Sequence, residues 1–375
     1  MRRRPSPTLL VTLVLVLVCA HGAVGPASTS AGAARHAVLI TLDGVRTEEI
    51  FGGIDLAVLK SVIEDGTLEE APLYRRYWAP TPEERRRKLM PFFWGTLMRD
   101  HGSIAGDRSR GSRVMLANRH RFSYPGYAEI LTGTPRDREI DSNAPRRNPY
   151  PTVLEFLRRA LGLDRHGVAA FASWEIFRWI VEHDEGALTV NAGYEAFDHA
   201  DADVHRLSAA QFETRTPWDS VRHDMYTFRL AMAHLASARP RVLYLALGET
   251  DDWAHDRRYD RTLQALEQTD TYLRELWAWL QNDAGYRDRT AILVTVDHGR
   301  GRTAADWHKH GDDVEGAQET WLAAIGPDWP RRGVWTNAQD VSASQVAATL
   351  ARALGVDYRS AAPEAGPPVE HLWGE

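Results

Sequence analysis

The sequence predicts an α/β fold with a largely parallel central sheet and helices on both of its faces. Four short apolar runs are continuous and rich in β-branched and aliphatic residues, as expected for strands buried on both faces. Segments with helical periodicity separate these runs, and the alternation of strands with helices is typical of a parallel sheet. The chain has 375 residues, of which 43% are hydrophobic, so it is long and apolar enough to form a sizeable core.

The elements are predicted in the following order. The strands are residues 37–42, 168–172, 242–247 and 291–296, and the main helices are residues 152–161, 219–238 and 259–280. Residues 82–99 are expected to form a helix near the surface. Residues 187–217 lack clear periodicity and are expected to form a cap or insertion over the sheet. Because no internal repeat is present, residues 35–375 are predicted to form a single domain.

The amino terminus has the pattern of a secretory signal peptide. Arginines at positions 2–4 precede an apolar run of about a dozen residues and then a stretch rich in Ala, Gly and Ser. The run is shorter than the roughly 18 to 20 apolar residues that span a bilayer, so no stable membrane anchor is expected. We therefore predict a signal peptide over residues 1–22, a leader to about residue 34, and export to the periplasm or the extracellular space.

Composition narrows the chemistry that the domain can perform. Acidic residues outnumber basic ones by six, and no window has the basic stripe with interleaved aromatics of a nucleic-acid binder, so nucleic acid is not an expected partner. The only cysteine, Cys19, lies in the predicted signal peptide, so a metal site must use His, Asp and Glu. Such ligands fit zinc or manganese and exclude thiolate zinc sites and iron–sulfur clusters.

Acidic residues and histidines follow three of the predicted strands. In the order of the chain, these residues are Asp43; then Asp251, Asp252 and His255; then Asp297 and His298. Ligands of open parallel sheets bind outside the carboxyl ends of the strands. One aspartate after a strand is commonly a helix cap, but three such strand ends together supply the ligands of a two-metal site.

Two further segments complete the pattern. Ser123, in the motif FSYPGY, is placed to open a helix, where backbone N–H groups would face an incoming anion. The alternative is a simple N-cap serine. His308 and His310 follow the last predicted strand. One of them could be a further site histidine at the carboxyl end of the sheet, and the alternative is that they are surface loop histidines.

The order of these motifs resembles the alkaline phosphatase superfamily, and most closely its nucleotide pyrophosphatase/phosphodiesterase branch. The resemblance covers about residues 37–328 and rests on the aspartate after the first strand, the serine motif, Asp-x-x-x-His, Asp-His-Gly and His-Gly. It implies an alkaline phosphatase-like fold and a hydrolase that binds two divalent ions, Zn²⁺ in the first place and Mn²⁺ as the alternative.

The resemblance also implies a role for each candidate residue. One ion would be bound by Asp251, His255 and His310, and the other by Asp43, Asp297, His298 and Ser123. Ser123 would be the nucleophile and form a phosphoserine intermediate, because a bound cation lowers the pKa of a coordinated hydroxyl. Asn143 is similar in position to an asparagine that contacts a phosphoryl oxygen. The four-residue spacing to His255 favours Asp251 over Asp252 as the ligand. The glycine after His310 favours His310 over His308. Both alternatives stay open.

The expected function is therefore that of an exported phosphodiesterase or phosphatase acting on a small-molecule phosphate ester. Monoester and diester substrates both stay open, because the diesterase branch commonly uses threonine where this chain has Ser123. Sulfatases of the superfamily have an arginine four residues after the reactive residue, where this chain has Tyr127, which argues against a sulfatase. The alternatives are a phosphomutase of the phosphoglycerate mutase type and a secreted non-catalytic binding protein on the same fold.

Overall fold

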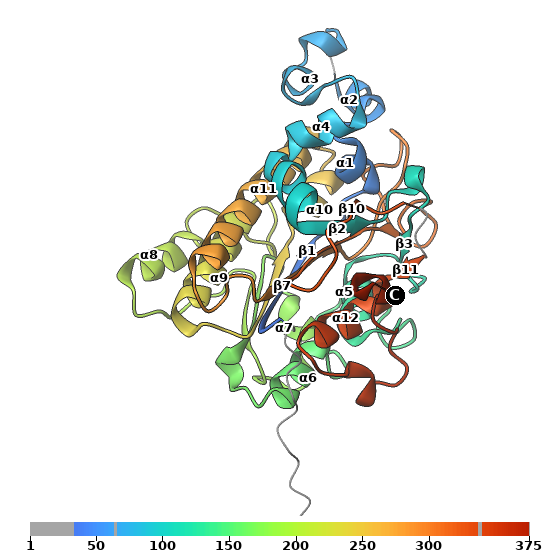
Figure 1. Ribbon diagram of the computed structural model, residues 1–375. Coiled ribbons are helices and arrows are strands. Elements are labelled where there is room, and N and C mark those ends of the chain that lie inside the picture. The colour runs from blue at the N-terminus through green and yellow to red at the C-terminus, as the bar shows by residue number, and fades with distance from the viewer. Residues whose placement is uncertain (1–33, 64–65, 337–339, 375) are drawn as a thin grey trace, which may run out of the picture.

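The computed structural model describes residues 34–63, 66–336 and 340–374. At its centre is an eight-stranded sheet with the strand order β10-β2-β9-β7-β1-β6-β4-β5 (Figure 1). The neighbours from β7 to β5 are parallel, whereas β9 runs antiparallel to both β7 and β2. The predicted α/β class with a largely parallel sheet is confirmed.

The four predicted strands are present, and further short strands extend the sheet. The sheet comprises β1 (His36–Leu42), β2 (Gly102–Ala105), β4 (Val168–Ala172), β5 (Thr189–Ala192), β6 (Val242–Leu247), β7 (Thr290–Val296), β9 (Leu322–Ile325) and β10 (Gly333–Val334). A second, small sheet comprises β3 (Val114–Met115), β8 (Glu319–Thr320) and β11 (Val341–Ser342). The strands that were not predicted have four residues or fewer, too few to show a period.

Helices pack on both faces of the large sheet. They are α1 (Thr47–Gly52), α2 (Leu56–Val62), α3 (Pro72–Tyr77), α4 (Pro82–Leu89), η2 (Phe93–His101), α5 (Ser123–Thr132), α6 (Val153–Ala160), α7 (Phe177–Ile180), α8 (Ala202–Ala210), α9 (Asp224–Ala238), α10 (Glu249–His255), α11 (Tyr259–Asn282) and α12 (Val346–Ala353). The short 3₁₀ turns are η1 (Leu68–Glu70), η3 (Arg108–Arg110), η4 (Arg165–Gly167), η5 (Ala343–Gln345), η6 (Tyr358–Ser360) and η7 (Glu370–Trp373).

Two hydrophobic cores lie on the two faces of the sheet. Side chains of β1 alternate between them, as the period of a strand requires: Leu39 belongs to one core, and Val38 and Ile40 belong to the other. The first core is covered by α5, α6, α7 and α12, and the second by α1, α9, η2 and α11 (Figure 1). The prediction of helices on both faces is therefore confirmed.

The predicted helix over residues 82–99 is wrong in two respects. It is divided, because α4 ends at Leu89 and η2 begins only at Phe93. Pro91 explains the break, since a proline disfavours helical conformation in the residue before it, and Met90 is accordingly non-helical (φ −130°, ψ 74°). The second part is also not at the surface, because it buries Phe93, Trp94, Leu97 and Met98 in the core.

Residues 187–217 differ from the expected cap. Their first part forms β5, the parallel edge strand next to β4, so it belongs to the sheet. The later part carries α8, which packs against α9. The fully buried Arg222 donates to Asn191 Oδ1 (2.7 Å) and Gln211 Oε1 (3.2 Å), which ties the end of α8 to β5.

The predicted signal peptide and Cys19 lie outside the described residues. Among the residues that the structure does describe, no helix combines the length and the apolar character needed to cross a membrane.

His36, at the start of β1, should make the fold less stable in acid. Its ring lies 3.8 Å from that of Tyr286, and burial lowers the pKa of His36 to about 4 from its usual 6.5. The unfolded chain therefore binds this proton before the folded chain does, and the stability present above pH 6.5 is lost as the pH falls toward 4. We expect His36→Phe to reduce the fall in the urea unfolding midpoint between about pH 7 and about pH 5. The matched control is His205→Phe on exposed α8, and an equal fall in both variants would contradict this assignment.

Candidate active site

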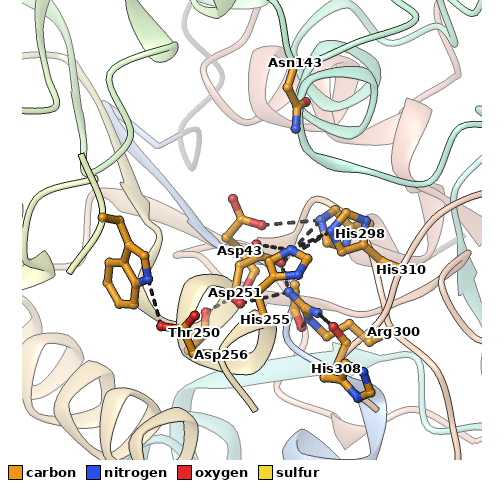
Figure 2. A network of polar contacts seen from close by, with 12 residues as sticks. Asp43, Asn143, Thr250, Asp251, His255, Asp256, His298, Arg300, His308 and His310 are labelled. Atoms are coloured by element: carbon orange, nitrogen blue, oxygen red, sulfur yellow. Dashed lines mark hydrogen bonds and ion pairs between the residues drawn. The ribbon is translucent and has the colours of Figure 1, made fainter. Parts of the chain in front are cut away.

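Three aspartates and three histidines meet at the carboxyl ends of the central strands (Figure 2). Asp43 follows β1, α10 follows β6 and carries Asp251 and His255, and Asp297 and His298 follow β7. Because β6, β1 and β7 are neighbours in the sheet, these strand ends lie side by side. His310 reaches the same place from the loop after β7. The structure thus brings together six of the seven residues expected as metal ligands, all except Ser123.

One part of the cluster surrounds His298 Nε2. This atom lies 3.4 Å from Asp43 Oδ1 and 3.5 Å from Asp297 Oδ2. All three atoms are buried and have no hydrogen-bond partner among the described residues. Buried polar atoms without a partner are costly, so three that face one another fit a bound cation.

The second atom of each of these side chains is held by a hydrogen bond. The Tyr127 hydroxyl donates to Asp43 Oδ2 (2.9 Å), and the Gly44 N–H donates to Asp297 Oδ1 (3.1 Å). His298 Nδ1 lies 2.9 Å from the carbonyl oxygen of the next residue, which can only accept, so Nδ1 carries the proton. The lone pair of His298 is then on Nε2, and each side chain presents one free ligand atom to the same point.

The other part of the cluster is formed by Asp251, His255 and His310. His255 Nε2 lies 3.1 Å from Asp251 Oδ2 and 2.9 Å from His310 Nε2. Asp251 Oδ1 lies 3.7 Å from His298 Nε2, so this aspartate faces both parts. In the described part of the chain, two sets have ligand atoms within 4.8 Å of one another: Asp251, His255 and His310; and Asp43, Asp251 and His298. The second set contains Asp251 where Asp297 was expected.

The electrostatics of the cluster favour a cation. Burial, and then repulsion from another carboxylate, raise the pKa values of Asp43 and Asp297. Burial, followed by repulsion from His298, lowers the pKa of His310 to about 2. Burial also acts to raise the pKa of Asp251, but Arg300 and then His255 outweigh it and hold that pKa well below its usual range. Crowded carboxylates beside a neutral imidazole are an environment that a divalent ion stabilises.

Arg300 is part of the site, although it was not among the residues that the sequence predicted there. Its side chain is 2% exposed, and its guanidinium pairs with the Asp251 carboxylate and donates to the backbone oxygens of Gly44 (3.1 Å) and His308 (2.5 Å). Arg300 therefore joins α10 to the loops after β1 and β7 that carry the rest of the cluster. Its position directly after the Asp-His-Gly motif is the sequence signal that could have placed it in the site.

The structure favours one member of each pair left open. Asp251 faces the histidines, whereas Asp252 belongs to neither ligand set, and burial, then Asp251, raise the pKa of Asp252 to about 9. Likewise, His310 belongs to a ligand set and His308 does not. Figure 2 shows His308 on the far side of Arg300.

Two buried carboxylates that belong to neither ligand set accept hydrogen bonds from backbone segments of the site. Asp224 accepts from the backbone N–H groups of Gly248 (2.8 Å) and Glu249 (3.2 Å), and so fixes the start of α10. Glu129 accepts from the N–H groups of Ala117 (2.9 Å) and Asn118 (2.8 Å) in the segment before Ser123. Glu129 is fully buried.

Ser123 is the first residue of α5 and is 6% exposed. One turn later, Tyr127 bonds Asp43, which places this end of α5 beside the cluster. The predicted row of free backbone N–H groups is not found, because the Tyr124 N–H donates to Asn143 Oδ1 (2.9 Å) and Pro125 has none. Figure 2 shows the amide nitrogen of Asn143 directed toward the cluster. The side chain of Asn143 therefore contacts the residue that follows Ser123.

Gly126→Ala should disturb the contact between α5 and the cluster. A Cβ atom on Gly126 would lie 2.3 Å from the backbone oxygen of Asp297, so only glycine allows this approach. We expect the free energy of unfolding to fall by about 1–3 kcal/mol, measured by urea denaturation. Gly95→Ala in η2 is the matched control, since a Cβ there meets nothing within 4 Å. Equal stability of the two variants would show that α5 does not pack as described.

Comparisons with known proteins identify the family. The family model for type I phosphodiesterase / nucleotide pyrophosphatase matches residues 160–361. No curated protein matches the sequence.

Solved structures with a similar fold cover most of the chain. A phosphonate monoester hydrolase from Silicibacter pomeroyi matches with a TM-score of 0.52 and 15% identity, over 91% of this chain and 77% of that one. A 2-O GAG sulfatase matches with a TM-score of 0.53 and 12% identity, over 91% and 75% of the two chains. The lipoteichoic acid synthase LtaP from Listeria monocytogenes matches with a TM-score of 0.54 and 9% identity, over 86% and 72%. At these identities the likeness shows the fold alone.

The fold is thus that of the alkaline phosphatase superfamily, as the resemblance implied. The family match spans more than half of the chain and includes the segments after β6 and β7 that carry five of the six clustered residues. This chain belongs to the type I phosphodiesterase / nucleotide pyrophosphatase family.

Proposed function

We propose that the protein is a metal-dependent hydrolase of phosphate esters in which Ser123 is the nucleophile. The observation that carries the proposal is the convergence of three buried, unpartnered ligand atoms: Asp43 Oδ1, Asp297 Oδ2 and His298 Nε2. Family membership supports a phosphate ester, and in particular a diester, as the substrate class. The argument from the unpartnered atoms is independent of the argument from family membership, because it rests on the geometry of this chain alone.

The donor atoms divide between two divalent ions. Asp251, His255 and His310 would hold one, and Asp43, Asp297, His298 and Ser123 would hold the other. All are nitrogen or oxygen donors, which suits Zn²⁺ and, as the alternative, Mn²⁺. When bound, the ions lower the pKa of the serine hydroxyl and neutralise charge on the phosphoryl oxygens.

The chain's own residues would carry the reaction in two displacements. Ser123 Oγ loses its proton and attacks phosphorus, the bond from phosphorus to the leaving-group oxygen breaks, and the leaving group departs as the alcohol once it gains a proton. A phosphoserine forms, which keeps the second ester group when the substrate is a diester. Water then attacks the phosphoserine, which releases the phosphate product and restores the hydroxyl. Asn143 would orient the substrate: its Oδ1 is fixed by the Tyr124 N–H, which leaves its amide N–H groups free to donate to a phosphoryl oxygen.

The residue at position 127 favours phosphate over sulfate esters. A tyrosine stands where the sulfatases of the superfamily have an arginine, and it serves to hold Asp43. The proposal includes export, with residues 1–22 as the signal peptide and a periplasmic or extracellular location.

The test is a paired assay of the metal-replete protein on 4-nitrophenyl phosphate and bis(4-nitrophenyl) phosphate. We expect metal-dependent hydrolysis that a chelator abolishes, with the diester preferred. Transfer of the phosphoryl group to an added alcohol in place of water would favour the phosphomutase. A folded, metal-replete protein that hydrolyses neither ester would overturn the proposal in favour of the non-catalytic binding protein.

Tyr127→Phe should weaken metal binding without removing a ligand. The substitution deletes only the hydroxyl that holds Asp43 Oδ2, and loss of such an orienting partner typically costs about 10- to 100-fold in metal affinity. The affinity is measured by competition with a chromophoric zinc chelator. Tyr124→Phe is the control, because the Tyr124 hydroxyl donates to the backbone oxygen of Arg146 (2.7 Å) and not to the cluster. Equal affinities would contradict a role for Tyr127 in orienting Asp43.

A further inference from the structure

A second cavity lies apart from the carboxylate–histidine cluster. Its volume is about 570 Å³, within the range of small-molecule sites, which is about 300–1,000 Å³. It is enclosed by α1, the start of α2, α4 and residues 107–109, and none of the residues proposed for catalysis lines it. We propose that this cavity binds a small organic anion, with its carboxylate or phosphate group on Arg86 and its apolar body against Phe51 and Trp78.

Arg86 is a buried cation that forms no ion pair with another described residue. Its residue is 9% exposed, and its guanidinium carbon lies 3.8 Å from the ring centroid of Trp94. In the described part of the chain it makes one hydrogen bond, a long one of 3.4 Å to the backbone oxygen of Phe51, and no ion pair. Burial lowers the pKa of Arg86 and outweighs the attraction of Glu83 and Asp107. A buried guanidinium in this state is stabilised by an added anion.

The carboxylates nearest to Arg86 are already engaged elsewhere. Arg110 donates to Glu83 Oε1 (2.8 Å) and lies 3.5 Å from Asp107 Oδ2. Asp107 Oδ1 accepts from the hydroxyl of Ser109 (2.6 Å). Both carboxylates thus pair with Arg110, and neither forms a hydrogen bond with Arg86, whose donors stay available.

The other two carboxylates that line the cavity do not replace an anion on Arg86 either. Asp55 caps α2 and pairs with Arg46. Burial raises the pKa of Glu48, which weakens its tendency to be charged.

A second arginine and two aromatic rings complete the recognition surface. Among the described residues, Arg85 donates only to backbone oxygens, including those of Gly52 (3.0 Å) and Ala79 (3.2 Å). Its guanidinium carbon lies 4.8 Å from the Trp78 ring centroid. Phe51 is buried and Trp78 is partly buried in the same wall. Guanidinium groups bind carboxylates and phosphates through paired N–H donors, and the rings accept an apolar body. An anion on a flat or apolar scaffold matches both features.

The test compares 2-naphthoate with its neutral isostere, 2-naphthamide, by isothermal titration calorimetry on the full chain. We expect naphthoate to bind at least tenfold more tightly, and 2-naphthylphosphonate as a further arm shows whether phosphate or carboxylate is preferred. Arg86→Gln should lower the affinity for naphthoate to that for naphthamide. Arg87→Gln is the matched control, because Arg87 is exposed on α4 and does not line the cavity.

Two further variants keep the outcome decisive. Asp251→Asn should leave naphthoate binding unchanged, which separates the cavity from the metal cluster. Ala57→Trp fills the cavity from its exposed rim while keeping Arg86, so it should abolish binding even if Arg86→Gln does not fold. The inference is overturned if neither probe binds, if both bind equally, or if binding is lost in Asp251→Asn and kept when the cavity is altered.

Discussion

Ser123→Ala should lower hydrolysis of bis(4-nitrophenyl) phosphate by at least about a thousandfold, because it removes the only proposed nucleophile. The fold should be unaffected, since Ser123 is the first residue of α5 and alanine is a good helix former. The turnover number is measured at saturating substrate and matched metal loading, so that a change in binding is not mistaken for a change in chemistry.

Ser142→Ala is the control for this result. Ser142 is the neighbour of Asn143 but has no place in the proposed reaction, so its loss should leave turnover within about twofold. Turnover by Ser123→Ala equal to that of the wild type would show that water or another group attacks phosphorus directly. Trapping of a phosphorylated wild-type protein, absent in the variant, gives the same information independently of the rate.

Asp251→Asn should have the second largest effect, because Asp251 faces both parts of the cluster. Its carboxylate lies 3.1 Å from His255 Nε2 and 3.7 Å from His298 Nε2, and it pairs with Arg300. An asparagine of the same shape brings no charge, so both ions lose attraction. We expect bound metal, measured by elemental analysis, to fall by more than half, and hydrolysis to fall by at least about a hundredfold.

Asp252→Asn is the matched control for Asp251→Asn. Asp252 is the adjacent residue on α10 and belongs to neither ligand set, so it should keep both metal and activity. The reverse result, with metal lost only in Asp252→Asn, would make Asp252 the ligand and contradict the assignment of Asp251.

The fold was predictable where a stretch of sequence determines its own structure. The runs that form β1, β4, β6 and β7 are apolar throughout because both faces of these strands are buried, and the structure confirms them within one residue. The edge strand β5 has four residues, and nothing local distinguishes it from a loop. The break between α4 and η2 could have been predicted from Pro91, since a proline restricts the conformation of the residue before it.

The candidate cluster was predictable from topology, because polar residues after neighbouring parallel strands must meet at one edge of the sheet. The residues that orient the cluster were not. Tyr127 lies one turn after Ser123, and only the packing of α5 against Asp297, directly after β7, shows that its hydroxyl reaches Asp43. The burial of Glu129 and the contacts of Arg300 likewise depend on residues distant in the sequence, Ser344 for Glu129 and Asp251 for Arg300.

The most direct test of the central claim is elemental analysis of the purified wild-type protein. The two proposed ligand groups, one with Asp251 and the other with Asp43, predict about two divalent ions for each chain, zinc or manganese, bound tightly enough to survive gel filtration. A folded protein with no bound metal, and with no turnover after zinc or manganese is added, would contradict the account and support a non-catalytic binding protein.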